Sequence, residues 1–237
     1  MKNYKYYFLY ILLVPLLISC AGRSYSIASE YRNKKISNSS LVIPTIDKIN
    51  IRQSDNLFEE KELNTIEREY FRLLSENLKD NIKSNSTFTS VNYVELKTKP
   101  ALETQAFDLD NGEPVHLDVP IKPVELNYSG NMCILFLEGV NLTIAKEQKD
   151  TSDPAKHYSV KSTDGSDIKL ANAKFYNNYF IFELKYLIYD NTSGKPVSYG
   201  IISFKQKYDI QKNVESLIKI AIEKMANNII KETPFER

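Results

Sequence analysis

The 237-residue chain has no tryptophan, two cysteines, two histidines and seven glycines, and each scarcity excludes a kind of site. Without tryptophan, the side chain best suited to stacking on sugars is missing. The histidines, His116 and His157, stand alone with few cysteines nearby, so no zinc site is expected. So few glycines provide no glycine-rich loop that could hold a phosphate. The sequence therefore predicts no cofactor and no metal.

An excess of charge of one sign is also missing. The chain carries 31 basic and 30 acidic residues, for a formal net charge of +1 at pH 7. Nucleic-acid binding needs a concentrated basic face, which this balance does not indicate. Strong attraction of the whole chain to anionic lipid headgroups is not expected either.

The amino-terminal segment is apolar but short. Its apolar core, residues 8–18, has about 11 residues, against the roughly 20 that a membrane-spanning helix needs. Lys2 and Lys5 precede the core and the small residue Ser19 follows it. A positive start, a short apolar core and a small residue at the cut are typical of a secretory signal peptide. We expect residues 1–19 to be that peptide.

The last residues of this segment and the residue after it, Leu17-Ile18-Ser19-Cys20, resemble the lipobox of bacterial lipoproteins. The resemblance implies that the Cys20 thiol receives a diacylglyceryl group, that the chain is cut before it, and that the new amino group is often acylated too, for example with palmitate. Two or more acyl chains make a stable membrane anchor, whereas one gives marginal binding. The alternative is a buried cysteine in an apolar helix of a cytosolic protein.

The residues after Cys20 bear on where such a lipoprotein would reside. Ala21 and Gly22 follow it, so the aspartate that signals inner-membrane retention in enteric bacteria is absent. By this resemblance, the outer membrane of a Gram-negative cell is expected, with the domain in the periplasm or at the cell surface. Residues 20–40 are polar and show no clear period, so we expect the lipidated cysteine to begin a flexible tether of at most about 65 Å.

Residues 41–237 are expected to form a single domain. Residues 41–51 are rich in β-branched side chains and predict a first strand. Asn56 and Glu59 match a capping box. They open a predicted helix that continues to about residue 83, because its apolar positions recur every three or four residues.

The remaining elements complete the predicted fold. Apolar or alternating patterns predict strands at 88–96, 132–145, 179–190 and 197–208, the last two forming a hairpin. A second amphipathic helix is predicted over about 210–231, with Asp209 as its N-cap. This order predicts an α+β fold, a two-layer sandwich in which a mainly antiparallel sheet packs on two amphipathic helices.

Two segments between these elements are polar. Residues 97–131 form a proline-rich insertion, and loops of this length in compact domains are often functional or disordered. Within it, Asp108-Leu109-Asp110-Asn111-Gly112 resembles the start of a calcium loop. However, its glycine comes one position early, and Val119 stands where a bidentate glutamate is needed. A tight turn at Asn111-Gly112 is the preferred interpretation. In the second segment, 146–171, a minor hairpin near Asp164-Gly165 is expected.

The remaining cysteine, Cys133, belongs to an apolar stretch. A buried, unreactive thiol is therefore the preferred interpretation, and a reactive thiol the alternative. No serine lies in a nucleophile elbow. The acidic residues lie in loops and on the polar faces of helices, so no pair can be assigned as acid and base. The sequence predicts no catalytic residue.

The layout of residues 41–96 and 132–231, with their late hairpin and closing helix, is similar to small envelope lipoproteins. These are the auxiliary lipoproteins of ABC transport systems and, more loosely, the α/β domains of the curli-secretion lipoprotein and of penicillin-binding-protein activators. Residues 97–131 depart from that layout. Cys20 alone can be matched to a functional residue of these families.

Three functions are compatible with the sequence. The first is a non-enzymatic, lipid-anchored accessory or scaffold for a cell-envelope complex, which would bind another envelope protein through the sheet edge or residues 97–131. The second is a periplasmic binding protein for a small apolar or lipidic ligand, held between the sheet and the helices. The third is a hydrolase with a dispersed site in the polar loops.

Overall fold

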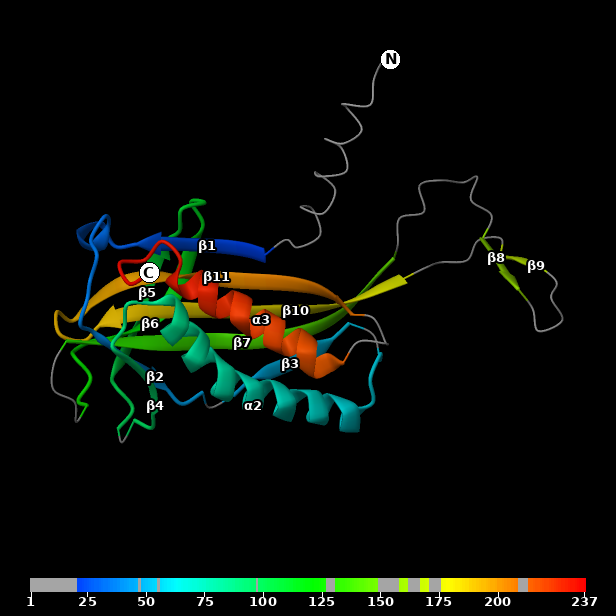
Figure 1. Ribbon diagram of the computed structural model, residues 1–237, viewed down its shortest axis with the longest axis horizontal. Helices are drawn as coiled ribbons and strands as arrows, with labels where there is room; N and C mark the ends of the chain where they lie inside the picture. Colours follow the sequence, from blue (N-terminus) through cyan, green and yellow to red (C-terminus); the bar gives the residue numbers. More distant parts are fainter. Residues whose placement is uncertain are drawn as a thin grey trace, which may run out of the picture.

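The computed structural model describes residues 21–46, 48–54, 56–96, 98–126, 131–148, 158–161, 167–170, 176–208 and 213–237. A seven-stranded sheet has the order β1-β11-β10-β7-β2-β4, and β3 pairs with β7 beside β2. Figure 1 shows the two helices crossing this sheet. The α+β class is confirmed. The sheet strands are β1 (Ala21–Ile27), β2 (Ser40–Pro44), β3 (Asn50–Gln53), β4 (Ser90–Val94), β7 (Met132–Gln148), β10 (Tyr176–Asp190) and β11 (Lys195–Tyr208).

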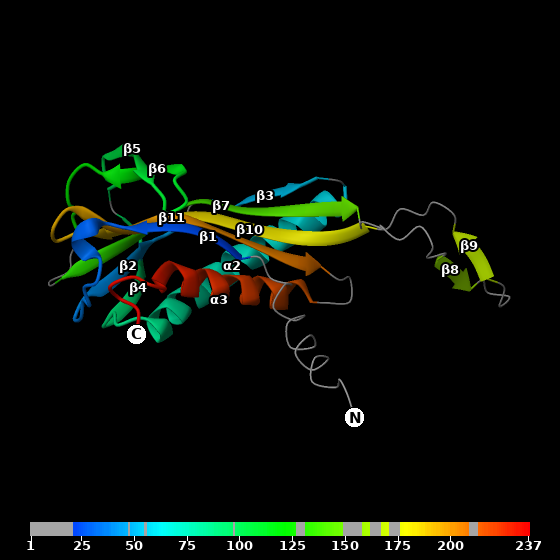
Figure 2. The same cartoon turned by 90° about the horizontal axis from the view of Figure 1, so that it is seen from above.

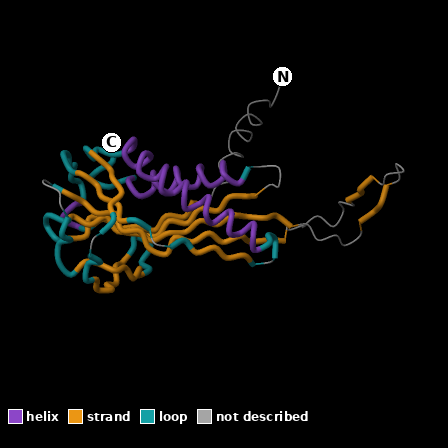
Figure 3. Tube along the Cα trace, turned by 90° about the horizontal axis from the view of Figure 1, so that it is seen from below, coloured by secondary structure: helices purple, strands orange, loops and turns teal. Residues whose placement is uncertain are grey.

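Helices α2 (Glu60–Asn85) and α3 (Val214–Ile230) cover one face of the sheet. Figure 2 shows the hairpin of β5 (Leu102–Asp108) and β6 (Pro114–Pro120) on the opposite face. Figure 3 shows the same division from below, with helices on one side of the strands. Within the described ranges, neither helix has the length and apolar character that a membrane crossing requires.

The main core lies between the sheet and the helices. The antiparallel pairs β7–β10 and β10–β11 form its floor, and the predicted hairpin of β10 and β11 is confirmed. Alternate residues of β10 point into this core because one face of the strand is covered by helices. The fully buried members are Phe180, Phe182, Leu184, Tyr186 and Ile188.

Helix α2 begins later than expected. The predicted capping box at Asn56 and Glu59 is wrong, because the box forms at Glu59 and Glu62, where the Glu59 N–H donates to Glu62 Oε2 at 2.9 Å. The side chain of Gln53 bonds both the N–H and the carbonyl of Phe58, each at 3.1 Å. These two hydrogen bonds hold the chain before Glu59 in a loop, so the helix cannot start there.

Helix α3 is also capped at a different residue from the predicted one. Asn213 is the N-cap, and its Oδ1 accepts the Glu215 N–H at 2.9 Å. Asp209, the expected cap, is therefore a wrong prediction and lies outside the described residues. An asparagine side chain is as good a cap as aspartate.

The predicted first strand is two strands. The range 41–51 covers most of β2 and the first two residues of β3, and both strands run parallel to β7 but pair with different parts of it. Pro44 ends β2, as expected for a residue without an N–H to donate. The sheet is therefore mixed: its parallel pairs are β2–β4, β2–β7 and β3–β7, and its antiparallel pairs are β1–β11, β10–β11 and β10–β7.

The insertion at 97–131 contains a folded hairpin. Val115, Leu117 and Val119 of β6 are buried against Leu187 and Tyr189 on the outer face of β10. The Asn111-Gly112 turn is confirmed: the Leu109 N–H donates to the Glu113 carbonyl at 3.1 Å, and Gly112 has a φ of 80°. A second hairpin, β8 (Tyr158–Lys161) with β9 (Asp167–Leu170), matches the expected minor one, whose turn lies outside the described residues.

The expected tether at 20–40 is wrong over its described residues. Ala21–Ile27 is strand β1, antiparallel to β11 along its whole length, and the short helix η2 (Ser29–Tyr31) follows it. The part-buried side chains of Tyr25 and Ile27 pack on the main core. The stretch looked unstructured because an edge strand buries little side-chain surface and is held mostly by backbone hydrogen bonds.

Side chains also fix the segment around β1. Arg23 Nη2 donates to the Lys231 carbonyl at 2.8 Å, which satisfies an unpaired group at the carboxyl end of α3. The Tyr31 hydroxyl donates at 2.9 Å to Oδ2 of Asp190, the last residue of β10. Burial raises the pKa of Tyr31 to about 12, so its hydroxyl stays protonated and can donate.

A hydrogen-bonded turn holds the acceptor of this contact in place. Partial burial raises the pKa of Asp190, but hydrogen bonds from Ser193, Tyr31 and two backbone N–H groups outweigh it and leave that pKa below its ordinary value. The carboxylate of Asp190 is therefore charged at neutral pH.

We predict that Gly200→Ala loosens β1. Gly200 lies opposite Tyr25, and an added Cβ would stand 2.4 Å from the Ser24 carbonyl oxygen and 2.9 Å from the Tyr25 Cα. Because both contacts are to backbone, β1 must shift, and the free energy of unfolding should fall by about 1–3 kcal/mol in urea denaturation. The control Ser203→Ala, on the same strand, should change it by less than about 0.5 kcal/mol. Equal stability of the two variants would contradict the docking of β1.

Candidate functional site

The two surfaces that the sequence suggested for binding lie together. A groove of about 500 Å³ lies between the end of β4 and the base of the β5–β6 hairpin. Strand β4 is the last strand of the sheet path and pairs only with β2 among the described strands. The groove is lined by Val94, Glu95, Thr98, Lys99, Pro100, Ala101, Lys122, Pro123, Val124, Glu125 and Leu126.

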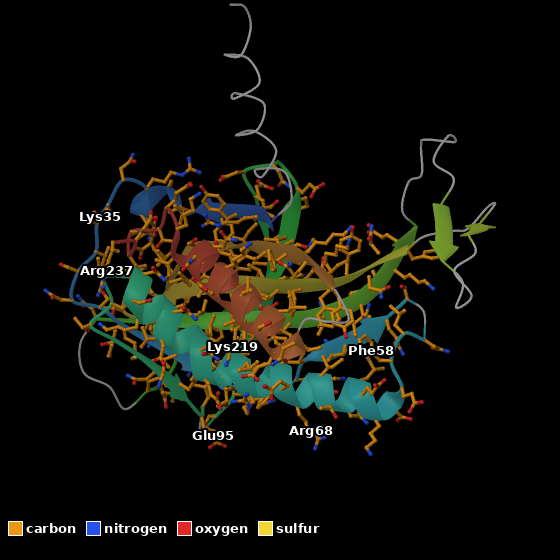
Figure 4. All side chains as sticks on the ribbon, turned by 45° about the vertical axis from the view of Figure 1, so that its right-hand side comes forward. Lys35, Phe58, Arg68, Glu95, Lys219 and Arg237 are labelled. Carbon is orange, nitrogen blue, oxygen red and sulfur yellow. The ribbon has the colours of Figure 1, made fainter. Side chains whose placement is uncertain are left out.

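The groove has an apolar lining and mixed charges. Its apolar residues come from β4, from the segment before β5 and from the segment after β6. Two acidic residues, Glu95 and Glu125, and two basic residues, Lys99 and Lys122, belong to the same lining. Figure 4 shows Glu95 on the side of the molecule away from β1. Such a surface suits a mainly apolar partner rather than a strongly charged one.

Two large apolar side chains beside the groove are exposed. Leu102 is 44% and Ile121 64% exposed. Leu102 is the first residue of β5 and Ile121 directly follows β6, at the base of the hairpin, where the Ile121 N–H donates to the Ala101 carbonyl at 3.0 Å. Single exposed apolar residues are common, but two of them beside this groove make it the candidate interaction surface of the domain.

One side chain, that of Asn191, holds in place the wall of the groove to which Val124 belongs. Asn191, in the turn between β10 and β11, accepts the Val124 N–H through Oδ1 at 2.7 Å and donates to the Val124 carbonyl through Nδ2 at 2.9 Å. These two hydrogen bonds resemble those between paired strands, and they hold the segment 122–126 against the turn between β10 and β11. The groove therefore has a preformed wall.

The base of the hairpin also rests on polar contacts. Glu138 of β7 accepts the Asp118 N–H at 2.9 Å. Burial raises the pKa of Glu138, and the backbone hydrogen bond and the charge of Lys185 oppose this shift. Because β6 is buried against β10, removal of residues 97–131 would expose Leu187 and Tyr189. A test of the groove therefore needs single substitutions rather than a deletion.

A second hollow, of about 770 Å³, lies where α2 and α3 begin. Phe58, Ile66, Tyr208 and Val214 are among its lining residues. Residues 209–212, which join β11 to α3, lie outside the described residues. We assign no site to this hollow.

The residues considered for chemistry do not converge. Cys133 is buried, and burial raises the pKa of its thiol, so the unreactive interpretation fits. Val119 is packed in the hairpin cluster and His116 is exposed on the same strand. In the described part of the chain, no three His, Cys, Asp or Glu residues gather as a metal site would require. His157 and Cys20 lie outside the described residues.

The structure is an α+β domain with a groove beside one edge strand of its main sheet. No family model and no curated protein matches the chain. Among solved structures, PelC of Paraburkholderia phytofirmans, a dodecamer, has a TM-score of 0.33 and 8% identity, with 90% of this chain and 97% of that chain covered. A neuraminyllactose-binding hemagglutinin homologue of Helicobacter pylori has a TM-score of 0.35 and 16% identity, with 85% and 86% covered. Similarity at this level carries no argument about function.

Proposed function

We propose that this protein is a lipid-anchored, non-enzymatic accessory protein of the bacterial cell envelope. Acyl groups on Cys20 hold it on a membrane, and the groove beside β4 binds an extended apolar segment of another envelope protein. By the lipobox resemblance and the absence of aspartate after Cys20, the membrane is the outer one, with the domain in the periplasm or at the cell surface.

The observation that carries the binding part is the position of the groove beside β4, which has β2 as its one strand neighbour among the described strands. An extended segment can pair with the free edge of β4 through backbone hydrogen bonds, while its side chains enter neighbouring pockets. The apolar lining and the exposed side chains of Leu102 and Ile121 supply such contacts. Asn191 holds the opposite wall in place, so binding requires little ordering of the groove itself.

A small apolar ligand in the same groove is the second candidate. Its volume of about 500 Å³ lies within the range of small-molecule pockets. The two candidates differ in what becomes bound near Ile121, a polypeptide or a small molecule.

We predict that Cys20→Ser abolishes acylation. In cells fed a labelled fatty acid, the unsubstituted protein and the control Cys133→Ala should take up label equally, because Cys133 is buried in the folded domain. Mass spectrometry should show that the unsubstituted protein begins at an acylated Cys20. Label retained by Cys20→Ser, or a mature chain that begins at Met1, would refute the anchor.

We predict a protein adduct at the groove. A photo-crosslinking amino acid at Ile121 should capture a discrete protein partner in intact cells, and the same residue at Ile220, 42% exposed on α3, should not. Leu102→Ser should weaken the adduct at least several-fold while changing the free energy of unfolding by less than about 0.5 kcal/mol. Equal adducts at both positions would count against the groove, and a small-molecule mass bound at Ile121 would support the second candidate.

A further inference from the structure

The chain provides no slack between the proposed anchor and the folded domain. Ala21, which begins β1 opposite Phe204, is joined to Cys20 by one peptide bond. Consecutive Cα atoms lie about 3.8 Å apart. An acylated Cys20 therefore holds this end of β1 close to the lipid headgroups. This inference rests on the proposed acylation.

Strand β1 continues from that point along one edge of the sheet. Its seven residues span about 20 Å and lead to η2 and then to a group of cations, Arg32, Lys34 and Lys35. All three are exposed. Figure 4 shows Lys35 at the end of the molecule where η2 lies. The β1 edge thus has the anchor at one end and a basic group at the other.

The three cations of this basic group form no salt bridge with any residue that the structure describes. Glu30, the acidic residue nearest in sequence, lies 3.2 Å from Lys195. Among the residues that the structure describes, no carboxylate lies within ion-pair distance of Arg32, Lys34 or Lys35. Their contacts leave charge available: Arg32 Nε and Lys35 Nζ donate to carbonyl oxygens, and Lys34 Nζ lies 5.7 Å from the centre of the Tyr31 ring. The net charge of the whole chain is close to zero and therefore does not reveal this local excess of positive charge.

We infer that the β1 edge of the domain faces the membrane, held at one end by the acyl groups on Cys20 and at the other by Arg32, Lys34 and Lys35 on anionic phospholipid headgroups. Cations near an anionic bilayer are attracted to it within a short screening distance. Strand β4 lies at the opposite edge of the sheet, about 24 Å farther out at the usual spacing of strands. The groove therefore faces the aqueous side.

The orientation can be measured on the acylated protein in vesicles. A fluorophore is attached at Ser29→Cys, in η2, or at Asn92→Cys, in β4, both exposed positions. Cys133 is buried and does not compete for the label. In vesicles of phosphatidylcholine mixed with phosphatidylglycerol, a quencher on the lipid headgroups should quench the label at position 29 several-fold more than the label at position 92. Equal quenching at both positions overturns the inference.

Two further variants separate the anchor from the charges. Joint replacement of Arg32, Lys34 and Lys35 by alanine should reduce quenching at position 29 to the level seen in pure phosphatidylcholine. Unchanged quenching at position 29 would show that Arg32, Lys34 and Lys35 do not hold the domain on the membrane. The matched control replaces Lys61, Arg68 and Lys79 of α2 by alanine, which removes the same charge away from the β1 edge and should have no effect.

A tethered form supplies the reference for a freely tumbling domain. A glycine-serine linker inserted between Cys20 and Ala21, combined with the three alanine replacements of Arg32, Lys34 and Lys35, should make quenching at positions 29 and 92 similar. If the linker leaves the difference unchanged, the direct attachment does not set the orientation and the inference fails. A chain without acyl groups at Cys20 overturns both this inference and the proposed function. An acylated chain with equal quenching overturns the orientation alone.

Discussion

The antiparallel pairing of β1 with β11 is the constraint on which the rest of the structure depends. Through it, the first described residues become one edge of the sheet. Three other parts of the fold meet that edge. In the turn between β5 and β6, the Asp110 N–H donates to the Tyr25 carbonyl. Arg23 of β1 donates to the Lys231 carbonyl at the carboxyl end of α3. The Tyr31 hydroxyl, shortly after β1, donates to Asp190 at the end of β10. The segment Ala21–Tyr31 is therefore hydrogen-bonded to the β5–β6 hairpin, to the end of α3 and to the end of β10.

The two edges of the sheet differ in what they offer to other molecules. At β1, the Tyr25 carbonyl is already hydrogen-bonded to the β5–β6 turn, and the Arg23 side chain is bonded to the carboxyl end of α3. These contacts limit pairing with a further strand. At β4, the described residues add no strand, and an apolar groove lies beside the free edge. In the proposed arrangement, the β1 edge contacts a membrane and the β4 edge binds a partner segment, in keeping with the groups that each edge exposes.

The long central elements could be predicted because their side-chain patterns are strong. Alternation along β10 follows from burial of one face, so Phe180 to Ile188 identified it. Strand β1 was missed because its contacts are mostly backbone, and because among its side chains that the structure describes, Tyr25 and Ile27 are the ones packed on the apolar core. In β6, Val115, Leu117 and Val119 alternate with polar residues, which is the pattern of a strand. The prolines on either side made this pattern hard to recognise as a strand. The groove had no local signal, because Asn191 joins segments far apart in the sequence.

Hydrogen exchange over residues 21–31 in the acylated protein tests the central claim most directly. If β1 is docked as described, its backbone N–H groups that bond to β11 exchange slowly, with protection similar to that of the facing residues 198–204. Exchange as fast as in an unstructured peptide, with β11 protected only on its β10 side, would contradict the account and restore a free tether between the membrane and the domain.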